Sequence, residues 1–445
     1  MPAPMHRNHS RQLHRNHLRQ LSSGFTLLSG TAIESAGFTN AEIIDFIDYV
    51  FSKAYRPHDF ATMFPALYAD EADSREHHYI VADGTKIVAA LLVMYKSLLS
   101  PAVSGQAGCA NLPFATVGNV AVHPRYRGQN LMREMMGQAI ADMQTAGIAF
   151  AILGGQRQRY SWYGFESGIA ALECGINRAN FTGERKLLLT DDLPIAVDEP
   201  TSPDEQLIAA LDELRRTTAP CHVHEDSGLD SRYTNRECRL AVVRKDRGEG
   251  KIAGYAIFNS TPQGLRLDDF AIDASIEPSL FMAALLRSFN VDNIQFTFSS
   301  SDLRLTQDLA AWAERIELCN CGRIMLLDIG RCLDFHLRKQ MAALSASDRP
   351  PVNLRLIIKN PPRPEIAAQC LDLLSDGTIY SLDIHPADNA PPADLPTLEL
   401  DYSVAVTALC STSGRDTLTP AQRKLLWPLA YYLPLDLYVP YPDHN

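Results

Sequence analysis

Hydrophobic and polar positions between residues 114 and 153 follow three patterns in succession. Residues 114–122 are mostly apolar and predict a strand. Residues 131–146 carry apolar side chains at helical spacing, and Gly147 stands where a left-handed helix cap belongs. Residues 148–153 are apolar throughout, as in a strand buried on both faces. We therefore expect a strand–loop–helix–strand unit whose two strands are parallel neighbours.

Related patterns lie before this unit and recur after it. Before it, the sequence predicts a helix at 39–53 and a hairpin with strands at 79–82 and 87–95. After it, a second hairpin is predicted with strands at 240–243 and 251–258. A second strand–helix–strand then follows, with strands at 265–272 and 294–298 and a helix at 278–289. The repeat has no Arg-x-x-Gly between Ile272 and Pro278. We expect a second domain of the same kind that lacks the loop chemistry of the first.

The last third of the chain has a different pattern. It is interrupted by proline pairs at 350–351, 361–362 and 391–392. We expect strands at 353–358, 378–384 and 397–401, and helices near 403–411 and 419–432. These elements predict a separate α/β unit.

Length and composition indicate an ordinary soluble protein of several domains. The chain has 445 residues, of which 46% are hydrophobic and 21% charged. The longest apolar run in its N-terminal part, 87–95, is too short to span a membrane, and residues 1–24 have no apolar core of a signal peptide. Nine scattered cysteines favour a reducing, cytoplasmic setting. Cys221-His222-Val223-His224 has no partner motif, so no metal site is predicted.

Charge is unevenly distributed. The net charge is −11, yet residues 1–24 contain four arginines and no acid, and His-Arg-Asn-His occurs at 6–9 and again at 14–17. We expect residues 1–24 to form a disordered basic tail. The acidic remainder argues against nucleic-acid binding and is compatible with attraction of cationic amines.

The loop between the two parallel strands has the chemistry of a phosphate site. It reads His123-Pro124-Arg125-Tyr126-Arg127-Gly128-Gln129-Asn130 and leads directly into a helix. Backbone N–H groups at such a helix start bind phosphate, the arginines add charge, and Gly128 permits close approach. The loop lacks the Gly-Lys-Ser/Thr of a nucleotide-triphosphate loop and the three glycines of a dinucleotide fold.

The pattern Arg-x-x-Gly-x-Asn after Val-x-Val-x-Pro resembles the acetyl-CoA signature of GNAT N-acetyltransferases. It departs from that signature at Asn130, where a small residue is usual; asparagine tolerates left-handed backbone angles. The resemblance implies that the two strands splay apart around the pantetheine arm. The implied acetyl-CoA-binding residues are Val120, Val122, Arg125, Arg127, Gly128, Gln129, Asn130 and Leu131.

A second motif follows at Tyr160-Ser161-Trp162-Tyr163-Gly164-Phe165. It resembles the Tyr-x-x-x-Gly-Phe of the same family, in which the tyrosine protonates the departing CoA thiolate. That role falls on Tyr160, whereas Tyr163 takes a packing position. The alternative is that Tyr160 only packs, with its hydroxyl satisfied.

Taken together, these features resemble the enhanced-intracellular-survival family of acetyltransferases. The resemblance implies a mixed α/β fold with a catalytic GNAT domain at 25–175, a degenerate GNAT-like domain at 176–322 and a sterol-carrier-protein-like domain at 323–445. It also implies a homo-oligomer, a hexamer in that family. In that family the C-terminal carboxylate is the general base, which here is the carboxylate of Asn445; a terminus without a role is the alternative.

The expected function is transfer of an acetyl group from acetyl-CoA to an amine by direct attack, because no Ser-His-Asp or Cys-His arrangement stands out. The acceptor is expected to be a cationic small molecule or a protein lysine. The alternative is a non-catalytic protein whose third domain binds a lipid or other ligand on a GNAT scaffold.

Overall fold

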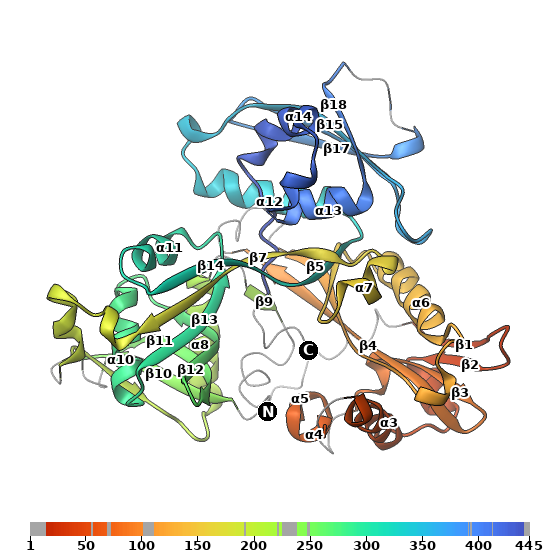
Figure 1. Cartoon of the computed structure of the whole chain (residues 1–445), viewed down its shortest axis with the longest axis horizontal. Coiled ribbons are helices and arrows are strands. Elements are labelled where there is room, and N and C mark those ends of the chain that lie inside the picture. Colours follow the sequence, from red (N-terminus) through yellow and green to blue (C-terminus); the bar gives the residue numbers. More distant parts are fainter. Residues whose placement is uncertain are drawn as a thin grey trace.

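The computed structural model describes residues 15–54, 57–68, 73–100, 111–190, 193–219, 222–224, 238–246, 250–389, 391, 394–411 and 413–439. Figure 1 shows two lobes, the N-terminal one in red to yellow and the next in green, with a third, blue part above them. The fold is mixed α/β.

The N-terminal lobe contains the predicted strand–loop–helix–strand unit. Its elements are β1 (His17–Gln20), β2 (Thr26–Ser29), α2 (Thr31–Ser35), α3 (Asn40–Ala54), α4 (Phe60–Met63), α5 (Pro65–Tyr68), β3 (His78–Asp83), β4 (Lys86–Leu99), β5 (Asn111–Val122), α6 (Leu131–Thr145), β6 (Phe150–Leu153), α7 (Arg157–Tyr160) and β7 (Glu166–Asn177). Strands β5 and β6 are parallel, as predicted. The apolar face predicted for α6 is buried or half-buried against the sheet.

The second lobe repeats this order. Its elements are β8 (Ile195–Asp198), α8 (Glu205–Thr218), β10 (Arg239–Lys245), β11 (Ile252–Thr261), β12 (Gly264–Ile272), α10 (Pro278–Ser288), β13 (Asn293–Ser299), α11 (Leu303–Ala310) and β14 (Arg315–Leu326). The short strand β9 (His222–His224) follows α8 in the chain but pairs with β4 of the first lobe. Strands β12 and β13 are parallel around α10, as β5 and β6 are around α6.

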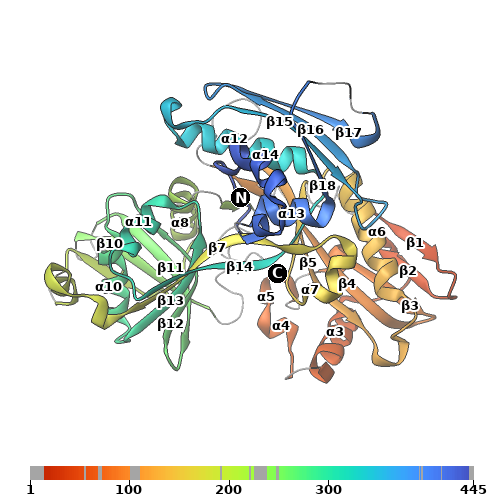
Figure 2. The same ribbon diagram turned by 45° about the horizontal axis from the view of Figure 1, so that its top comes forward.

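Two strands are exchanged between the lobes. Strand β7 leaves the first lobe and pairs with β13 of the second, and β14 returns and pairs with β6 of the first. β7 and β14 also pair with each other, so the described strands of both lobes form one 14-stranded sheet. Figure 2 shows the two strands crossing between the lobes. The limits predicted at 175/176 and 322/323 both fall inside these strands.

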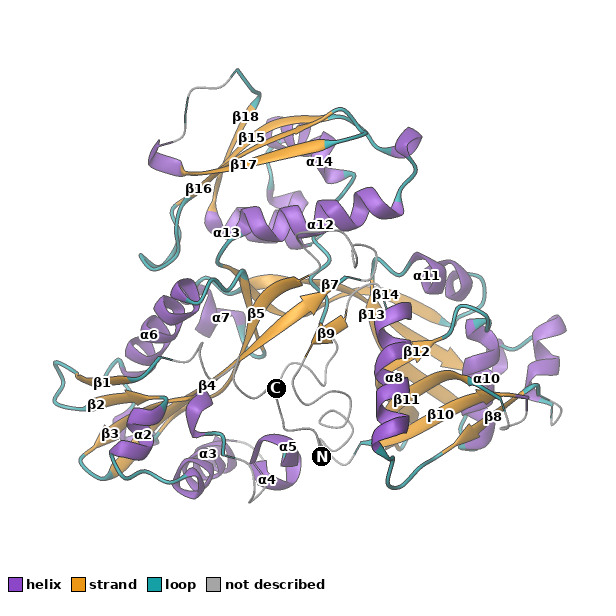
Figure 3. Cartoon of the chain, turned by 180° about the vertical axis from the view of Figure 1, so that it is seen from behind, coloured by secondary structure: helices purple, strands orange, loops and turns teal. Residues whose placement is uncertain are grey.

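The third part has its own sheet. It contains α12 (Ile329–Ala343), β15 (Val352–Lys359), β16 (Gln369–Ser375), β17 (Tyr380–Pro386), β18 (Thr397–Asp401), α13 (Tyr402–Cys410) and α14 (Pro420–Ala430). Its strand order is β17-β16-β15-β18. Helices α12 and α13 lie between this small sheet and the large one (Figure 3). The predicted strands at 353–358, 378–384 and 397–401 correspond to β15, β17 and β18, and the two predicted helices to α13 and α14, but α12 and β16 were not predicted. The likeness of this part to a sterol-carrier protein stays a prediction.

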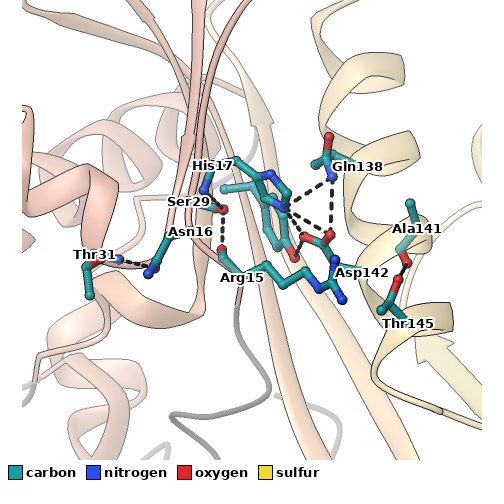
Figure 4. A network of polar contacts seen from close by, with 10 residues as sticks. Arg15, Asn16, His17, Ser29, Thr31, Gln138, Ala141, Asp142 and Thr145 are labelled. Carbon is teal, nitrogen blue, oxygen red and sulfur yellow. Dashed lines mark hydrogen bonds and ion pairs between the residues drawn. The ribbon is translucent and has the colours of Figure 1, made fainter.

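Residues 15–24 correct one expectation. They are not disordered: β1 pairs with β2 and docks on α6. His17 Nε2 lies 2.8 Å from a carboxylate oxygen of Asp142 on α6, which also accepts a 2.8 Å hydrogen bond from Tyr79, and Gln138 completes the network (Figure 4). The basic, polar sequence had no apolar pattern that could signal this strand. Residues 1–14 lie outside the described residues.

The chain after α14 is anchored to both the third part and the second lobe. Asp436 is 4% exposed, forms an ion pair with Lys339 of α12, and accepts a 2.7 Å hydrogen bond from Ser299 at the end of β13. Burial by itself raises the pKa of Asp436, but Lys339 and the serine hydroxyls bring that pKa down to about 2. The ionised carboxylate therefore stabilises the fold above about pH 4, and this contribution is lost as the pH falls towards 2.

Asp436→Asn should lower the free energy of unfolding by about 3–5 kcal/mol, because it leaves the Lys339 ammonium buried without a counter-charge. The measurement is thermal and urea unfolding at pH 7. The loss of stability between pH 4 and 2 should be smaller in the variant than in the wild type.

The control is Lys359→Gln, which breaks a 2.6 Å pair with Glu399 in which both side chains are about half exposed. It should change stability by about 0–1 kcal/mol. Equal stability of Asp436→Asn and wild type would show that this contact does not hold the C-terminal segment.

Candidate active site

The loop after β5 has the backbone shape of an anion site. Gly128 has φ 82° and Asn130 has φ 61°, both left-handed, so the tolerance expected of Asn130 is confirmed. Asn130 is the N-cap of α6, yet its side chain makes no capping hydrogen bond. The first-turn amides of α6 are therefore not satisfied by a cap and face a site to which the helix dipole attracts negative charge.

Strands β5 and β6 separate next to this loop. Their register runs from Phe114↔Phe150 to Val117↔Leu153. Beyond that point β5 continues for five residues, whereas β6 ends at Leu153 and the segment after it leaves the sheet at Gly154. The splay expected from the resemblance is thus present, and it leaves backbone groups unpaired on the β6 side of β5.

A β-bulge in β5 lies on this edge. Ala121 pairs with Ala90 and Gly118 with Leu92, so Asn119 and Val120 together oppose a single residue of β4. Asn119 has φ 49°. The bulge redirects the backbone of β5 at the opening of the splay.

A buried hydrogen-bond chain supports the bulge. The Asn119 side-chain amide donates to the Tyr68 hydroxyl, and Tyr68 is 1% exposed. That hydroxyl lies 3.2 Å from His78 Nε2, while His78 Nδ1 lies 2.7 Å from the Ser74 carbonyl. Burial lowers the pKa of His78 to about 4, so its ring is neutral at pH 7. Nδ1 then donates to Ser74 and Nε2 accepts from Tyr68.

The splay opens into a cavity of about 880 Å³, which we name the β5–β6 cleft. Its lining residues are Val50, Phe51, Ala54, His58, Phe60, Met63, Phe64, Val117–Val120, Val122, Tyr126–Gly128, Asn130–Arg133, Leu153–Gln156, Arg159, Tyr160 and Tyr163. Three of them are arginines and none is an acid, although the whole chain is acidic. The described lining thus favours an anionic ligand.

Most of the sequence-predicted residues meet in this cleft. Those that line it are Val120, Val122, Arg127, Gly128, Asn130, Leu131 and Tyr160. Arg125 and Gln129 are exposed outside the lining; the Arg125 amide donates to His123 Nδ1 at 3.2 Å. His123 stacks on Tyr49 and does not line the cleft either. Asn445 lies outside the described residues.

Tyr160 is held in place by its neighbours. Arg157, one turn earlier on α7, forms a 2.7 Å ion pair with Glu166, which is 3% exposed. The Tyr160 ring lies against Gly155, where a Cβ would approach a ring carbon to 3.1 Å. Tyr163 also lines the cleft, under the Arg363 guanidinium, so it does more than fill the packing position predicted for it.

Sequence reasoning did not find several lining residues. His58, Met63 and Phe64 come from the segment after α3, where an apolar pattern gave no sign of a cleft wall. Arg133 could have been found, because a basic residue in the first turn of the helix after a phosphate loop faces the same ligand. In the described part of the chain, no group of three His, Cys, Asp or Glu is placed to hold a metal ion.

Comparisons with known proteins agree with this geometry. Residues 38–168 match the family model described as acetyltransferase (GNAT) domain. A probable N-acyltransferase from Enterococcus faecalis superposes with TM-score 0.59 at 15% identity over 87% of this chain and 90% of that one. A GCN5-related N-acetyltransferase from Kribbella flavida gives TM-score 0.59 at 15% identity, covering 90% and 94%. Eis1 from Mycobacterium abscessus gives 0.53 at 13%, covering 83% and 86%.

The chain therefore carries a GNAT acetyltransferase domain and shares the fold of these three structures over most of its length. Among curated proteins, none matches it. No helix in the described ranges is long and apolar enough to cross a membrane.

Tyr68→Phe should destabilise the bulge, because Asn119 and His78 each lose a buried hydrogen-bond partner. The expected cost is about 1–3 kcal/mol in unfolding free energy. Amides of residues 118–122 should exchange hydrogen faster, as measured by mass spectrometry.

Tyr255→Phe is the matched control. Its hydroxyl donates at 2.9 Å to Asp269 in the buried part of the second lobe. It should cost stability without accelerating exchange at 118–122. Unchanged exchange there in Tyr68→Phe would mean that the buried chain does not support the bulge.

Proposed function

We propose that this protein is an acetyl-CoA-dependent N-acetyltransferase that acetylates an amine. The observation that carries the proposal is the loop with left-handed residues at the uncapped N-terminus of α6. This loop lies where β5 and β6 separate into a cleft, and no Asp or Glu is found among the lining residues that the structure describes. The loop suits a diphosphate, and the unpaired strand edge suits an amide-containing arm.

The proposed reaction is direct attack. A neutral amine attacks the thioester carbonyl, and the oxyanion accepts hydrogen bonds from backbone N–H groups near Val120 and Val122. The C–S bond breaks, and the thiolate takes a proton from the Tyr160 hydroxyl. The nitrogen gives its proton to a base, which leaves the acetylated amine and free CoA. Tyr160 recovers its proton from solvent.

The base is proposed to be the carboxylate of Asn445. Two observations support a terminal group: the described lining of the cleft contains no acid, and the C-terminal segment is anchored up to Tyr438, whose hydroxyl donates at 2.9 Å to the Thr297 carbonyl. His58 is the alternative, since it is the one histidine among the described lining residues.

The acceptor is proposed to be a cationic small molecule or an exposed lysine, in keeping with the acidic chain. A homo-oligomer, hexameric as in the family that the sequence resembles, is also part of the proposal. Light scattering tests it, since a mass near 49.3 kDa would mean a monomer.

Calorimetry should detect acetyl-CoA binding in the micromolar range, and Arg127→Ala combined with Gly128→Val should weaken it strongly. Gly128 has open space around its Cβ position but a left-handed φ, so valine strains the loop without a clash in the core. Thermal stability should change little because the loop is on the surface. Absence of binding at millimolar acetyl-CoA would favour the ligand-binding scaffold instead.

Tyr160→Phe should leave acetyl-CoA affinity nearly unchanged and lower turnover about 10²–10⁴-fold, because only the proton donor is removed. The measurement is thiol release with an amine acceptor. Tyr163→Phe is the matched control and should retain most activity. Loss of turnover in Tyr163→Phe but not in Tyr160→Phe would assign the proton donor to Tyr163 and contradict its assignment to Tyr160.

The same assay separates the two bases. Deletion of residues 443–445 should abolish turnover without affecting acetyl-CoA binding if the terminal carboxylate is the base. In that case His58→Gln should remain active. The reverse pattern would assign the base to His58.

A further inference from the structure

A second cavity, of about 420 Å³, lies beside the β5–β6 cleft. We name it the basic cavity; it is lined by Arg19, Asn130, Arg133, Glu134, Gly137, Gln138, Ala141, Arg363 and Glu365. These residues come from β1, from α6 and from the β15–β16 loop of the third part. Asn130 and Arg133 line both cavities, so the two meet at the first turn of α6.

Three guanidinium groups gather in the basic cavity. Arg19 forms a 3.0 Å pair with Glu134, and Arg363 a 2.8 Å pair with Glu365. Arg133 is exposed on α6, and its guanidinium has no carboxylate partner in the part of the chain that the structure describes. Arg133 therefore has its hydrogen-bond donors available for a ligand.

Arg133 and Arg363 both line the basic cavity, one from α6 and the other from the loop between β15 and β16. The Arg363 guanidinium lies 5.9 Å from the centre of the Tyr163 ring. Burial raises the pKa of Tyr163, and the positive charges of Arg363 and Arg133 act against that rise. Gly137 allows this arrangement: a Cβ there would lie 2.7 Å from Nη2 of Arg363. The third part thus extends an arginine across α6 to the border of the β5–β6 cleft.

The ligand of the proposed function carries a group that matches this place. In coenzyme A the diphosphate and a second phosphate, at the 3′ position, are attached to the same ribose. When the diphosphate sits on the loop and the pantetheine arm enters the splay, the ribose leaves the loop on the side away from the splay. The basic cavity is the adjoining space. A phosphate monoester carries nearly two negative charges at pH 7, and guanidinium groups bind it through paired hydrogen bonds.

We propose that Arg133 and Arg363 bind the 3′-phosphate of coenzyme A in the basic cavity. This inference rests on the proposed function. Because Arg363 belongs to the third part, that part contributes to the binding site of the acyl donor. The Arg363 guanidinium favours CoA esters that carry the 3′-phosphate over those that lack it. Arg19 and its partner Glu134 also line this cavity.

The test compares acetyl-CoA with 3′-dephospho-acetyl-CoA by calorimetry on the full-length chain. Wild-type protein should bind the dephospho compound roughly 10- to 100-fold more weakly, the range expected for hydrogen bonds to a charged group. Arg363→Gln, outside the β5–β6 cleft, should weaken acetyl-CoA binding about 10-fold and leave dephospho-acetyl-CoA binding unchanged, whereas Arg133→Gln, which also lines that cleft, should weaken acetyl-CoA binding more than dephospho-acetyl-CoA binding. Their discrimination between the two ligands should shrink accordingly.

Arg159→Gln is the matched control, because Arg159 lines the β5–β6 cleft but not the basic cavity. It should preserve the ratio of the two affinities. Arg363→Lys should recover part of the lost discrimination, which separates phosphate binding from a packing defect in the loop. Arg133→Gln changes an exposed side chain and should leave unfolding unaffected.

Each outcome decides a different point. Equal affinity of the wild type for the two compounds would overturn this inference and leave the proposed function standing. Binding of neither would overturn the proposed function. Loss of discrimination in Arg159→Gln alone would place the 3′-phosphate on the α7 side and contradict the assignment to Arg133 and Arg363.

Discussion

Strands β7 and β14 are exchanged between the two lobes, and this exchange joins the lobes into one sheet. Each lobe completes its sheet with a strand supplied by the other, and the two strands pair along most of their length. Neither lobe can therefore bury its sheet edge alone. Because β14 holds one edge of β6, the separation between β5 and β6 opens on the other edge, beside the loop. The strand exchange thus determines where the cleft can form.

The second lobe shows why equal topology does not give an equal site. Strands β12 and β13 also stop pairing early, after Leu267↔Phe296. The short connection to α10 contains no Arg-x-x-Gly, and the C-terminal segment lies against the freed edge, where Tyr438 donates to the Thr297 carbonyl. This hydrogen bond gives the Thr297 carbonyl an intramolecular partner beyond the point where β12 and β13 stop pairing. The same strand topology therefore separates the strands in both lobes, whereas the residues next to each separation differ.

Charge is arranged so that an acidic protein presents a basic site. The β5–β6 cleft is lined by arginines and no described acid, and the neighbouring cavity adds two more arginines, each paired with a glutamate. Such a field would concentrate an anionic acyl donor at the cleft, while the acidic remainder of the chain attracts cationic acceptors. This distribution of charge is consistent with the proposed function, in which the acyl donor is anionic and the acceptor cationic.

The strand–loop–helix–strand unit and a loop that tolerates a left-handed Asn130 could be predicted from the sequence, because side-chain periodicity and turn chemistry are local. Tyr160 was singled out by the resemblance of its motif to that of a known family, and the structure places it in the lining of the cleft. Four features could not be predicted from the sequence: β7 and β14 cross between the lobes, His17 contacts Asp142, Tyr68 hydrogen-bonds Asn119, and Arg363 contacts α6. Each of these joins residues far apart in the chain through polar groups or open sheet edges. Hydrophobic periodicity carries no record of such pairings, because it shows which face of an element is buried and not which partner buries it.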